Sequence, residues 1–465
     1  MTQRFAGIGA RVIFALVVFA VFVVAITSRP AKRLLDFDQS FYLTIAYDLD
    51  RHGVFSNGVF DDVDSTTTRP PPGMFFSPLY PWVVFGAMKL DSRFAAAVEC
   101  AIEANHKKRD LATCEIYARP MLIIHALFLT LGIVAIALAG EIMFGGARVF
   151  LLSGALATTG AAAEAELFSN VMTESIWFSL YSVTMLTFVA ALTTFRRLYF
   201  ILAGLLLGFL CLTRPSFLLL APVLLAIAFV YLRWFARDAP QPWLAQAVAF
   251  SLAFLVLIAP WAARNYISIG KPALTEEYGS ATLVERFAFN DMTLREFLLA
   301  FPYCVPKVGP AAVELFAPGA TSRFEWDQPG SFFEQGRARR IALVAAHGRL
   351  DPVIGGLLRD EMAHNWWRHV LTTVPLGWCG LFVSGLWSLF MIPLFAWACV
   401  AAARQGQPLF LLYALPGLLL VGLHAGIANH YPRYNLGLLG PFAVGGAWTT
   451  SRMMSATPRK RAQQA

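Results

Sequence analysis

The chain has 465 residues, of which 57% are hydrophobic and 14% are charged, and its mean hydropathy is +0.59. About 25% of the residues of an ordinary soluble domain are charged, so this composition excludes that class. The formal net charge of +8 would suit a nucleic-acid-binding protein if the excess basic residues gathered in one patch, but that excess is spread over short connections and the two termini, and the long polar segments are nearly neutral. The composition therefore predicts an all-α polytopic membrane protein.

Ten apolar runs approach the roughly 20 residues that a helix needs to cross the hydrocarbon core of a bilayer. We interpret the first run as a retained span and not as a signal peptide, because no convincing small-residue cleavage site follows it. All 465 residues would then form one integral membrane domain. The expected spans lie near residues 11–27, 120–140, 148–166, 172–193, 198–212, 216–234, 244–261, 380–402, 408–427 and 434–450.

The short connections indicate how these spans are oriented. With ten spans, the excess basic residues all fall on one side of the membrane, and basic residues in short loops mark the cytoplasmic side. Both termini are then cytoplasmic, and two long, nearly neutral segments, 28–118 and 262–370, face outward. The basic residues concerned are Arg4, Arg11, Arg148, Arg196, Arg197, Arg233, Arg237, Arg404, Arg452, Arg459, Lys460 and Arg461.

The first outer segment has helical patterns of its own. Apolar residues recur at helical spacing from Phe41 to Leu49, which predicts an amphipathic helix over 38–53. The prolines of "RPPPGM" (69–74) separate it from a second, aromatic-rich helix over 75–90, because proline is tolerated only near a helix start. Such a helix is typical of the membrane interface. The second outer segment is expected to form short helices and loops that cap the bundle.

Six cysteines occur in the chain. Cys100 and Cys114 lie in the first outer segment, where an oxidising compartment permits a disulfide, although two free thiols are the alternative. Cys211, Cys379 and Cys399 lie in apolar helices and are expected to act as small hydrophobic residues. Cys304 would then have no partner.

Carboxylates near membrane spans are candidates for function, because ionisable groups at membrane depth are costly. Glu164, Glu166 and Glu174 gather where the third and fourth spans turn on the outer side, and Asp38 opens the first outer helix. We interpret Glu164 and Glu166 as parts of a solvated turn. Glu174, which opens a span in "NVMTESIWF", is a candidate functional residue.

Arginines lie at the outer ends of several helices. Arg69 precedes the triple proline, Arg214 follows the fifth span, Arg264 ends the seventh and Arg433 precedes the tenth. A guanidinium at such a position can hold a phosphate by paired hydrogen bonds, whereas the alternative for each is a side chain that merely reaches the interface. Four of them on the side with few basic loops favour an outer anion site.

These motifs carry a family resemblance. "DQSFYLTIAYDLDRHG" resembles the first outer-loop motif of the GT-C fold glycosyltransferases that use polyprenyl-phosphate donors, the group of the protein O-mannosyltransferases and the lipid A aminoarabinose transferases. The matching positions are Asp38, Tyr42, Ala46, Leu49 and Gly53. "RPPPGMFFSPLYPWV", "TESIWFSL", "AGLLLGFLCLTRPSFLLLAP", "APWAARNYISIG" and "RYNLGLLGP" are similar to the later landmarks of that group, in the same order. The resemblance covers nearly the whole chain.

The chain also departs from that pattern. Gln39 stands where a second acidic residue often follows the first Asp, and Phe41 stands where the aminoarabinose transferases have an Arg. Thr68 occupies the position of an acidic residue in their proline-rich stretch. The resemblance would allow a divalent cation, but a metal site that depends on that acid is in doubt here, so no metal ligand is assigned.

The resemblance implies a GT-C-type bundle and an inverting transfer of a sugar from a polyprenyl-phosphate donor to an acceptor hydroxyl. Such a transfer needs a base for the hydroxyl proton and a cation for the departing phosphate. We assign Asp38 as the base or as the group that orients the acceptor. Tyr42 would orient the helix of Asp38, and Glu174 would support the acceptor or the sugar. The candidates for the phosphate are Arg264 and Arg433, then Arg69, with Arg214 as a further member of the set.

Other functions are weaker fits. A ligase that transfers a whole lipid-linked oligosaccharide would use a similar bundle. A transporter or lipid flippase would place polar groups near the bilayer midplane and not at helix ends, and an assembly partner in the envelope is a further alternative. "DEMAHNWWRH" (360–369) lacks HExxH spacing, so a zinc site on Glu361, His364 and His369 is disfavoured. We expect a bacterial inner membrane protein with its site facing the periplasm, and the sugar and acceptor stay open.

Overall fold

The computed structural model describes residues 2–29, 33–58, 69–236, 243–428 and 431–462. Every secondary-structure element within these ranges is a helix. The chain divides into two compact units, residues 1–275 and 276–465. The division falls inside the second outer segment, and each unit is described by itself.

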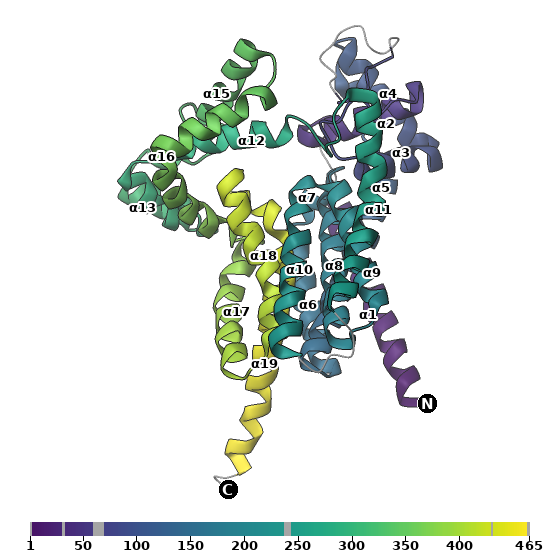
Figure 1. Ribbon diagram of the computed structural model, residues 1–465, viewed down its shortest axis with the longest axis vertical. Helices are drawn as coiled ribbons and strands as arrows, with labels where there is room; N and C mark the ends of the chain where they lie inside the picture. Colours follow the sequence, from purple (N-terminus) through teal and green to yellow (C-terminus); the bar gives the residue numbers. More distant parts are fainter. Residues whose placement is uncertain (1, 30–32, 59–68, 237–242, 429–430, 463–465) are drawn as a thin grey trace. The chain divides into compact units, whose positions relative to one another are not determined.

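Unit 1 is built on long apolar helices that pack side by side, with three shorter helices, α2 to α4, gathered at one end (Figure 1). Helices α1 and α5 are antiparallel neighbours, and Arg11 of α1 pairs with Glu141 near the end of α5 at 2.7 Å. The α-helices are α1 (Thr2–Thr27), α2 (Phe37–His52), α3 (Leu79–Leu90), α4 (Ser92–His106), α5 (Arg119–Phe144), α6 (Ala147–Ala163), α7 (Ala165–Ser169), α8 (Glu174–Thr194), α9 (Arg197–Thr213), α10 (Leu220–Val230) and α11 (Trp243–Ile269). Short 3-10 or π turns are η1 (Leu111–Thr113), η2 (Pro215–Leu219) and η3 (Tyr231–Phe235).

Helices α9 and α11 approach each other closely because glycine leaves room for the facing backbone. A Cβ atom at Gly204 would lie only 2.3 Å from the carbonyl oxygen of Phe250, so no larger residue fits there. Gly204 and Gly208 form the GxxxG pattern that is typical of tight helix pairs in membranes. This contact fixes the ends of α9 and α11, which form one wall of the site described below.

The predicted amphipathic helix of the first outer segment is confirmed as α2. Its apolar face, including Tyr42, Ile45 and Leu49, is buried, and it ends at Gly53 in the left-handed conformation (φ 64°) that glycine adopts readily. The second helix, α3, begins at Leu79 and not at residue 75, because Pro78 precedes its first turn.

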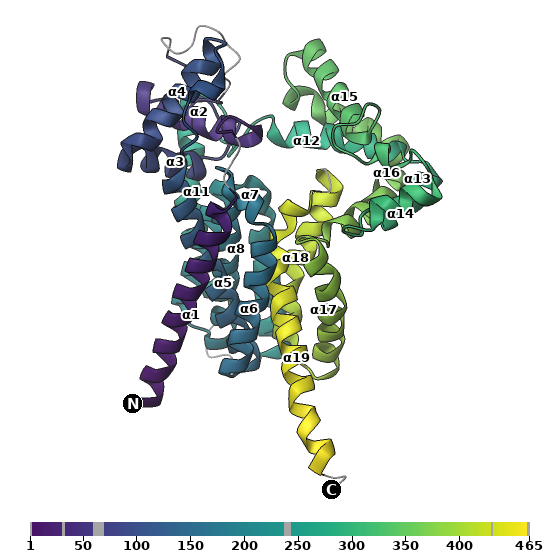
Figure 2. The same cartoon turned by 180° about the vertical axis from the view of Figure 1, so that it is seen from behind.

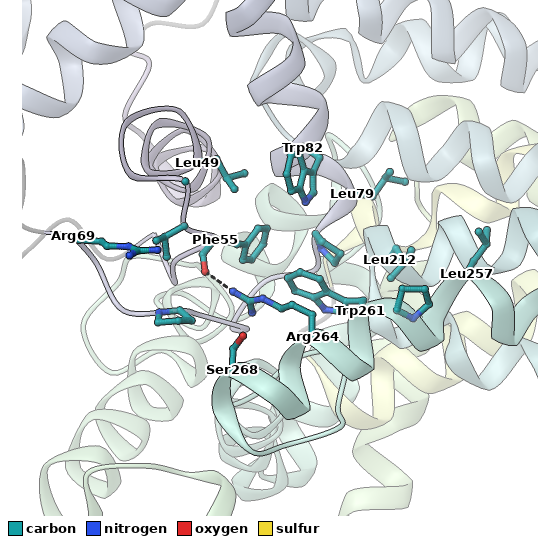
Figure 3. Close-up of a pocket in the computed structure, with 15 residues that line it drawn as sticks. Leu49, Phe55, Arg69, Leu79, Trp82, Leu212, Leu257, Trp261, Arg264 and Ser268 are labelled. Carbon is teal, nitrogen blue, oxygen red and sulfur yellow. Dashed lines mark hydrogen bonds between the residues drawn. The ribbon is translucent and has the colours of Figure 1, made fainter.

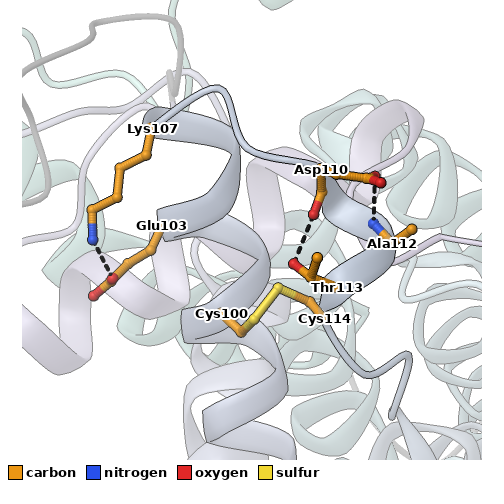
Figure 4. Close-up of a disulfide and its surroundings, with 7 residues drawn as sticks. All are labelled: Cys100, Glu103, Lys107, Asp110, Ala112, Thr113 and Cys114. Atoms are coloured by element: carbon orange, nitrogen blue, oxygen red, sulfur yellow. Dashed lines mark hydrogen bonds and ion pairs between the residues drawn. A yellow bond between two sulfur atoms is a disulfide. The ribbon is translucent and has the colours of Figure 1, made fainter.

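A disulfide joins Cys100 on α4 to Cys114 just after η1 (Figure 4). The connection between them is also held by hydrogen bonds, since the side chain of Asp110 accepts from the backbone N–H of Ala112 at 2.9 Å and Lys107 donates to Glu103 at 2.7 Å. This resolves the choice between a bond and two free thiols in favour of the bond.

Unit 2 combines a bundle of α17, α18 and α19 with a cap of shorter helices around α16 (Figure 2). A cluster that includes Phe289, Phe332 and Phe333 forms the core of the cap. The α-helices are α12 (Tyr278–Phe287), α13 (Leu294–Tyr303), α14 (Gly309–Phe316), α15 (Phe332–His347), α16 (Asp351–Gly380), α17 (Leu386–Arg404), α18 (Pro408–Ile427) and α19 (Leu439–Ala462). The 3-10 turns are η4 (Ala288–Asp291), η5 (Thr321–Arg323) and η6 (Pro432–Leu438).

Within the described ranges, seven helical segments are long and apolar enough to cross a membrane, and α6 and α9 are apolar helices of 17 residues. They correspond to nine of the ten expected spans, and the tenth, 434–450, forms η6 and the first part of α19. The expectation of an all-α multi-pass bundle is confirmed. The eighth span begins at Leu386 and not near 380, because α16 extends to Gly380 and Gly385 interrupts the chain with φ 54°.

Two cysteine predictions are wrong. Cys304, expected to have no partner, and Cys379, expected to act as a small hydrophobic residue, form a second disulfide. Because 75 residues separate the two in sequence, their proximity depends on the packing of α13 against α16. Cys211 and Cys399 are free thiols, as predicted.

Candidate functional site

A pocket of about 600 Å³ lies in unit 1 between α3, α9 and α11 (Figure 3). Most of its wall is apolar or aromatic, and two of the predicted arginines, Arg69 and Arg264, line it. Its lining comprises Leu49, Gly53, Val54, Phe55, Arg69, Pro72, Pro78, Leu79, Trp82, Leu212, Leu257, Pro260, Trp261, Arg264 and Ser268. An apolar cavity with a few cationic groups is suited to a ligand with a charged head and a hydrocarbon part.

Arg264 lies near the end of α11 and is half-buried. Its guanidinium donates to the carbonyl oxygens of Gly73 at 2.6 Å and Phe55 at 3.0 Å, and to the side chain of Asn265 at 2.9 Å. The guanidinium carbon lies 4.8 Å from the centre of the Trp261 ring, and Figure 3 shows it reaching from α11 to Phe55. Among the residues that the structure describes, no carboxylate contacts Arg264. Its partners orient the positive charge without neutralising it.

The carbonyl groups that hold Arg264 belong to two chain segments, 55–57 and 73–75, that are joined by hydrogen bonds. We call this pair of segments the clasp. The N–H of Gly73 donates to the carbonyl of Phe55 at 2.7 Å, and the side chain of Asn57 accepts from Met74 and Phe75 at 2.8 and 3.0 Å. A Cβ atom at Gly73 would lie 2.3 Å from the backbone N of Asn57. Glycine is therefore required for the close approach that makes this wall.

The clasp is anchored to α2 through a buried carboxyl group. Ser56 donates to Asp48 at 2.5 Å, and its oxygen accepts from the N–H of Gly58 at 3.0 Å. Asp48 is buried, and this burial raises the pKa of its carboxyl group to about 6, against the hydrogen bond from Ser56, which lowers it. Sequence reasoning missed this pair because Asp48, although inside the first outer-loop motif, is not one of its matching positions, and Ser56 lies outside the motif.

Arg69 lines the same pocket but is exposed. It follows the segment 59–68, which lies outside the described residues. That segment includes Thr68, which stands at the position of the family's acidic residue. The pocket thus brings together Arg69 and Arg264, which are 195 positions apart in the chain, and gives one an exposed and the other a half-buried guanidinium.

Asp38 lies in the first turn of α2 and is half-buried. Its neighbour Gln39 is buried; its side-chain oxygen accepts from the N–H of Val171 at 3.2 Å, and its side-chain nitrogen donates to the carbonyl of Arg33 at 3.1 Å. The start of α2 is therefore tied to the turn that precedes Glu174. A carboxylate in the first turn is also favoured by the positive end of the helix dipole.

Tyr42 is buried one turn further along α2. Its ring packs edge-on against Phe76 and Tyr80, with ring centres 5.1 and 4.9 Å apart. Tyr80 in turn lies 3.0 Å from Nε2 of His125, whose Nδ1 lies 2.9 Å from the carbonyl of Phe168. Because a carbonyl only accepts, His125 donates through Nδ1 and receives the hydroxyl proton of Tyr80 at Nε2. This buried chain braces α2 against α5, and nothing in the sequence singled out His125.

Glu174 and Arg214 form an ion pair at 2.5 Å. Glu174 is the first residue of α8 and is completely buried, whereas 17% of the Arg214 side chain stays exposed. Arg214 also donates to Thr173 at 3.1 Å and lies 5.4 Å over the ring of Trp177. The charge of this arginine is therefore neutralised by a carboxylate, in contrast to that of Arg264.

Arg433 belongs to unit 2, in η6, where its guanidinium lies 5.4 Å from the ring centres of both Tyr431 and Tyr434. Also in unit 2, Arg286 is fully buried, and burial lowers its pKa to about 9. It donates to the carbonyl of Ala425 at 2.7 Å and to Asn290 at 2.9 Å. These hydrogen bonds join α12 to the end of α18, so the role of Arg286 is structural.

Of the candidate zinc residues on α16, Glu361 and His369 both contact the side-chain nitrogen of Asn290, at 2.8 and 3.2 Å, and His364 lies apart from them. Nε2 of His369 lies 2.8 Å from the carbonyl of Gly426, and His364 is exposed. Three acidic side chains do lie within 4.8 Å of one another elsewhere in unit 2: Glu276, Glu277 and Asp351. Glu277 accepts from the N–H groups that open α16, Asp351 accepts from the N–H of Glu277, and Arg349 pairs with both glutamates. Helix capping accounts for this cluster.

No family model matches the sequence, and no match is found among curated proteins. Solved structures do resemble the fold. The oligosaccharyltransferase of Archaeoglobus fulgidus, tethered to an acceptor peptide, is 12% identical with a TM-score of 0.50, and the match covers 97% of this chain and 50% of that one. ArnT from Cupriavidus metallidurans is 15% identical in its apo state (TM-score 0.46, covering 99% and 62%) and 16% identical when bound to undecaprenyl phosphate (0.38, covering 94% and 78%).

This chain therefore spans half of the oligosaccharyltransferase and about three fifths of apo ArnT. At these identities the likeness concerns the fold alone. The likeness to the oligosaccharyltransferase, with its TM-score of 0.50, confirms the GT-C-type helix bundle that the sequence motifs implied.

Proposed function

We propose that this protein is a membrane glycosyltransferase that moves a sugar from a polyprenyl-phosphate donor to an acceptor hydroxyl at the outer face of a bacterial inner membrane. The observation that carries the proposal is the guanidinium of Arg264, held by main-chain carbonyls in an apolar pocket without a carboxylate among the described residues. The sequence motifs around Asp38 and the GT-C-type fold support the same reaction class.

The pocket matches the chemistry of such a donor. A polyprenyl phosphate has a hydrocarbon tail, for which Leu79, Leu212 and Leu257 provide apolar contacts, and an anionic head, for which Arg69 and Arg264 provide donors. Guanidinium groups form charge-assisted hydrogen bonds to phosphate oxygens. Outside water, they also stabilise the charge that develops on a departing phosphate.

In the proposed reaction, the oxygen of the acceptor hydroxyl forms a bond to the anomeric carbon of the sugar. The bond from that carbon to the phosphate oxygen breaks, and the phosphate leaves with the electron pair. Asp38 is assigned to take the hydroxyl proton or to orient the hydroxyl as it is lost, although it lies in the first turn of α2 and the pocket is lined only by the other end of that helix. A single displacement of this kind inverts the anomeric configuration. The reaction as written uses only these groups, and transfer measured with and without a chelator tests whether a divalent cation also takes part.

The remaining predicted residues have supporting roles in this proposal. Tyr42 holds α2 in place through its packing on Phe76 and Tyr80. The Glu174–Arg214 pair is the candidate contact for the sugar or the acceptor, because the exposed edge of Arg214 can still donate to a hydroxyl. Arg433 is a second candidate for the phosphate, and the variant Arg433→Gln, assayed for donor affinity, tests its contribution.

The test compares envelope glycolipids and glycoproteins by mass spectrometry in a strain that lacks the gene, complemented with wild type, Asp38→Asn or Arg264→Gln. Wild type should restore one hexose-, uronate- or pentose-sized increment, and both variants should fail at equal expression. Arg93→Gln is a matched control, because Arg93 is exposed and pairs with Glu115 away from the pocket. Normal glycans with Asp38→Asn would remove the assignment of the base.

The alternative of an oligosaccharide ligase is favoured by the likeness to the archaeal oligosaccharyltransferase. The same experiment separates the two enzymes, because a ligase would change the mass by a whole glycan and not by one sugar. Glycans that do not change on deletion would favour the transporter or assembly alternatives and would contradict the proposal.

A further inference from the structure

In unit 2, helices α13 and α14 carry an apolar surface that is separate from the core. On α13, Leu294, Phe297, Leu298 and Phe301 follow the i, i+3, i+4, i+7 spacing of one helical face, and Leu294 and Leu298 are exposed. The opposite face, with Leu299, Ala300 and Tyr303, already packs into the cluster around Phe289. Helix α13 is thus apolar on two sides. Packing into the core accounts for only one of them, and the outward face is left without a partner in the core.

Helix α14 continues the same kind of surface. Leu315 and Phe316 at its end are 75% and 82% exposed, and Val308, just before the helix, is 59% exposed. We call the set Leu294, Leu298, Val308, Leu315 and Phe316 the anchor face. Exposed apolar side chains on two helices that pack against each other mark a candidate interaction site.

The position of the anchor face along the membrane follows from how α13 is attached. Cys304, at the end of α13, forms a disulfide with Cys379, and the indole of Trp378 donates to the carbonyl of Phe301 at 2.9 Å. Both partners belong to the last turn of α16. The candidate span α17 begins at Leu386, a few residues later. The end of α13 is thus fixed where the chain enters the bilayer.

Figures 1 and 2 agree with this placement, because within unit 2 both views show α13 beside the end of α16 that leads into α17, and Figure 2 shows α14 there too. The exposed face of α17 starts at the same level with Leu386, Leu389 and Phe390. The exposed apolar side chains at the start of α17 therefore lie next to the anchor face, which is also apolar.

The charges around the anchor face also suit a membrane surface. Arg295 and Lys307 are exposed, and within the described part of the chain neither forms an ion pair. Of the neighbouring acids, Glu296 pairs with Arg323 at 2.7 Å, whereas Asp291 and Glu314 are exposed, and Glu314 accepts from the N–H of Gly319 at 2.8 Å. Basic residues beside an apolar face are typical of helices that lie in the plane of a bilayer containing anionic lipid.

We propose that α13 and α14 form a disulfide-fixed anchor whose apolar face is immersed in the leaflet next to the start of α17. The occupant of this surface is lipid and not another protein. The inference concerns unit 2 alone and does not depend on which reaction the protein catalyses.

The test uses the full chain in nanodiscs of phosphatidylethanolamine and phosphatidylglycerol, with a benzophenone amino acid at Leu315 or, in a second variant, at Leu298. After irradiation, intact mass spectrometry should find protein–lipid adducts. The control position is Arg337 on α15, which is exposed on a polar helix. Lipid adducts at the two anchor positions should exceed those at Arg337 by about tenfold, as for a residue below the headgroups.

Two results would overturn the proposal. Adducts to another part of the chain, or to a second copy, would show that protein covers the anchor face. A lipid yield at both Leu315 and Leu298 no higher than at Arg337 would show that the face lies in water. Both side chains point away from the core, and an intact Cys304–Cys379 bond, measured on the same samples, confirms that the cap has folded.

Discussion

Arg214 and Arg264 occupy similar places in unit 1 and have opposite electrostatic surroundings. Arg214 directly follows α9 and Arg264 lies in the last two turns of α11. Each is close to a tryptophan ring, at 5.4 Å from Trp177 and 4.8 Å from Trp261 respectively. Arg214 pairs with the buried carboxylate of Glu174. Arg264 is held by carbonyl oxygens, which orient a guanidinium but leave its charge for an anion. The partner and not the position thus decides whether the charge of the arginine is neutralised within the fold or is available to an anion.

The largest effect is expected on stability when Glu174 is replaced. Glu174→Ala leaves the guanidinium of Arg214 largely buried without its carboxylate, and breaking a buried pair in this way costs about 3–5 kcal/mol. The free energy of unfolding in detergent micelles measures this loss. The control is Glu115→Ala, which breaks the exposed pair with Arg93. Equal behaviour of the two variants would mean that Glu174 and Arg214 are not coupled as described.

The next effect concerns pH and the clasp that holds Arg264. The pKa of Asp48 is raised to about 6 by burial, so the folded state retains a proton that the unfolded chain loses near pH 4. The protonated carboxyl group therefore favours the fold below pH 4, and this contribution, about 3 kcal/mol, is lost as pH rises to 6. Asp48→Asn keeps a neutral group in place.

We expect Asp48→Asn to abolish this part of the pH dependence and to be more stable than wild type at pH 7. Thermal unfolding at several pH values between 4 and 7 measures it, with Asp110→Asn in the exposed connection after α4 as the control. A wild-type stability that does not fall between pH 4 and 6 would contradict the burial of an ionisable Asp48.

A smaller effect, on function, is expected at Arg264. Arg264→Gln should keep part of the hydrogen bonding to Phe55 and Gly73 but remove the charge. We expect transfer from a polyprenyl-phosphate sugar to fall about 100-fold, or about 2.7 kcal/mol. The rate with purified protein and a synthetic donor measures this. If Arg214→Gln lowers the rate more than Arg264→Gln while stability is equal, the comparison between the two arginines fails.

Arg69 should give the smallest of these effects. It lines the same pocket from an exposed position, where water screens its charge, so Arg69→Gln should weaken donor binding about tenfold. The binding of a polyprenyl phosphate without sugar, at low and high salt, measures it. Because exposed charges are screened more, the Arg69 contribution should fade at high salt and that of Arg264 should persist.

Several features were accessible from the sequence because they depend on neighbours along the chain. The spacing from Phe41 to Leu49 and the following Gly53 predicted α2, and hydropathy predicted the spans. Cys100 and Cys114 are 14 positions apart, close enough for one short connection to join them. Arg214 and Arg264 were recognisable as residues near helix ends from the apolar runs beside them, whereas Arg69 lies in a non-helical stretch ten residues before α3 begins.

The rest depends on contacts between distant segments. Arg214 and Glu174 are 40 positions apart, and nothing in the sequence revealed that this arginine pairs with that carboxylate. The partners of Arg264 are main-chain carbonyls, which every residue carries and no motif reveals. Cys379 lies in an apolar run and looks like a packing residue until α13 is placed beside α16. His125 likewise lies in an apolar run, on α5, and no motif marks its contact with Tyr80.

Because carbonyl groups hold Arg264, its contacts do not depend on which side chains its partners carry, and this affects how the pocket can change in evolution. Substitutions at Phe55 alter a ring but cannot delete the acceptor, because the carbonyl is common to all residues. The guanidinium of Arg264 therefore keeps its acceptors after most substitutions around it. Gly73 is the exception, because any side chain there collides with Asn57. Related proteins would be free to vary Trp82 and Leu79 and so adapt to new lipids, while the charged end of the pocket stays in place.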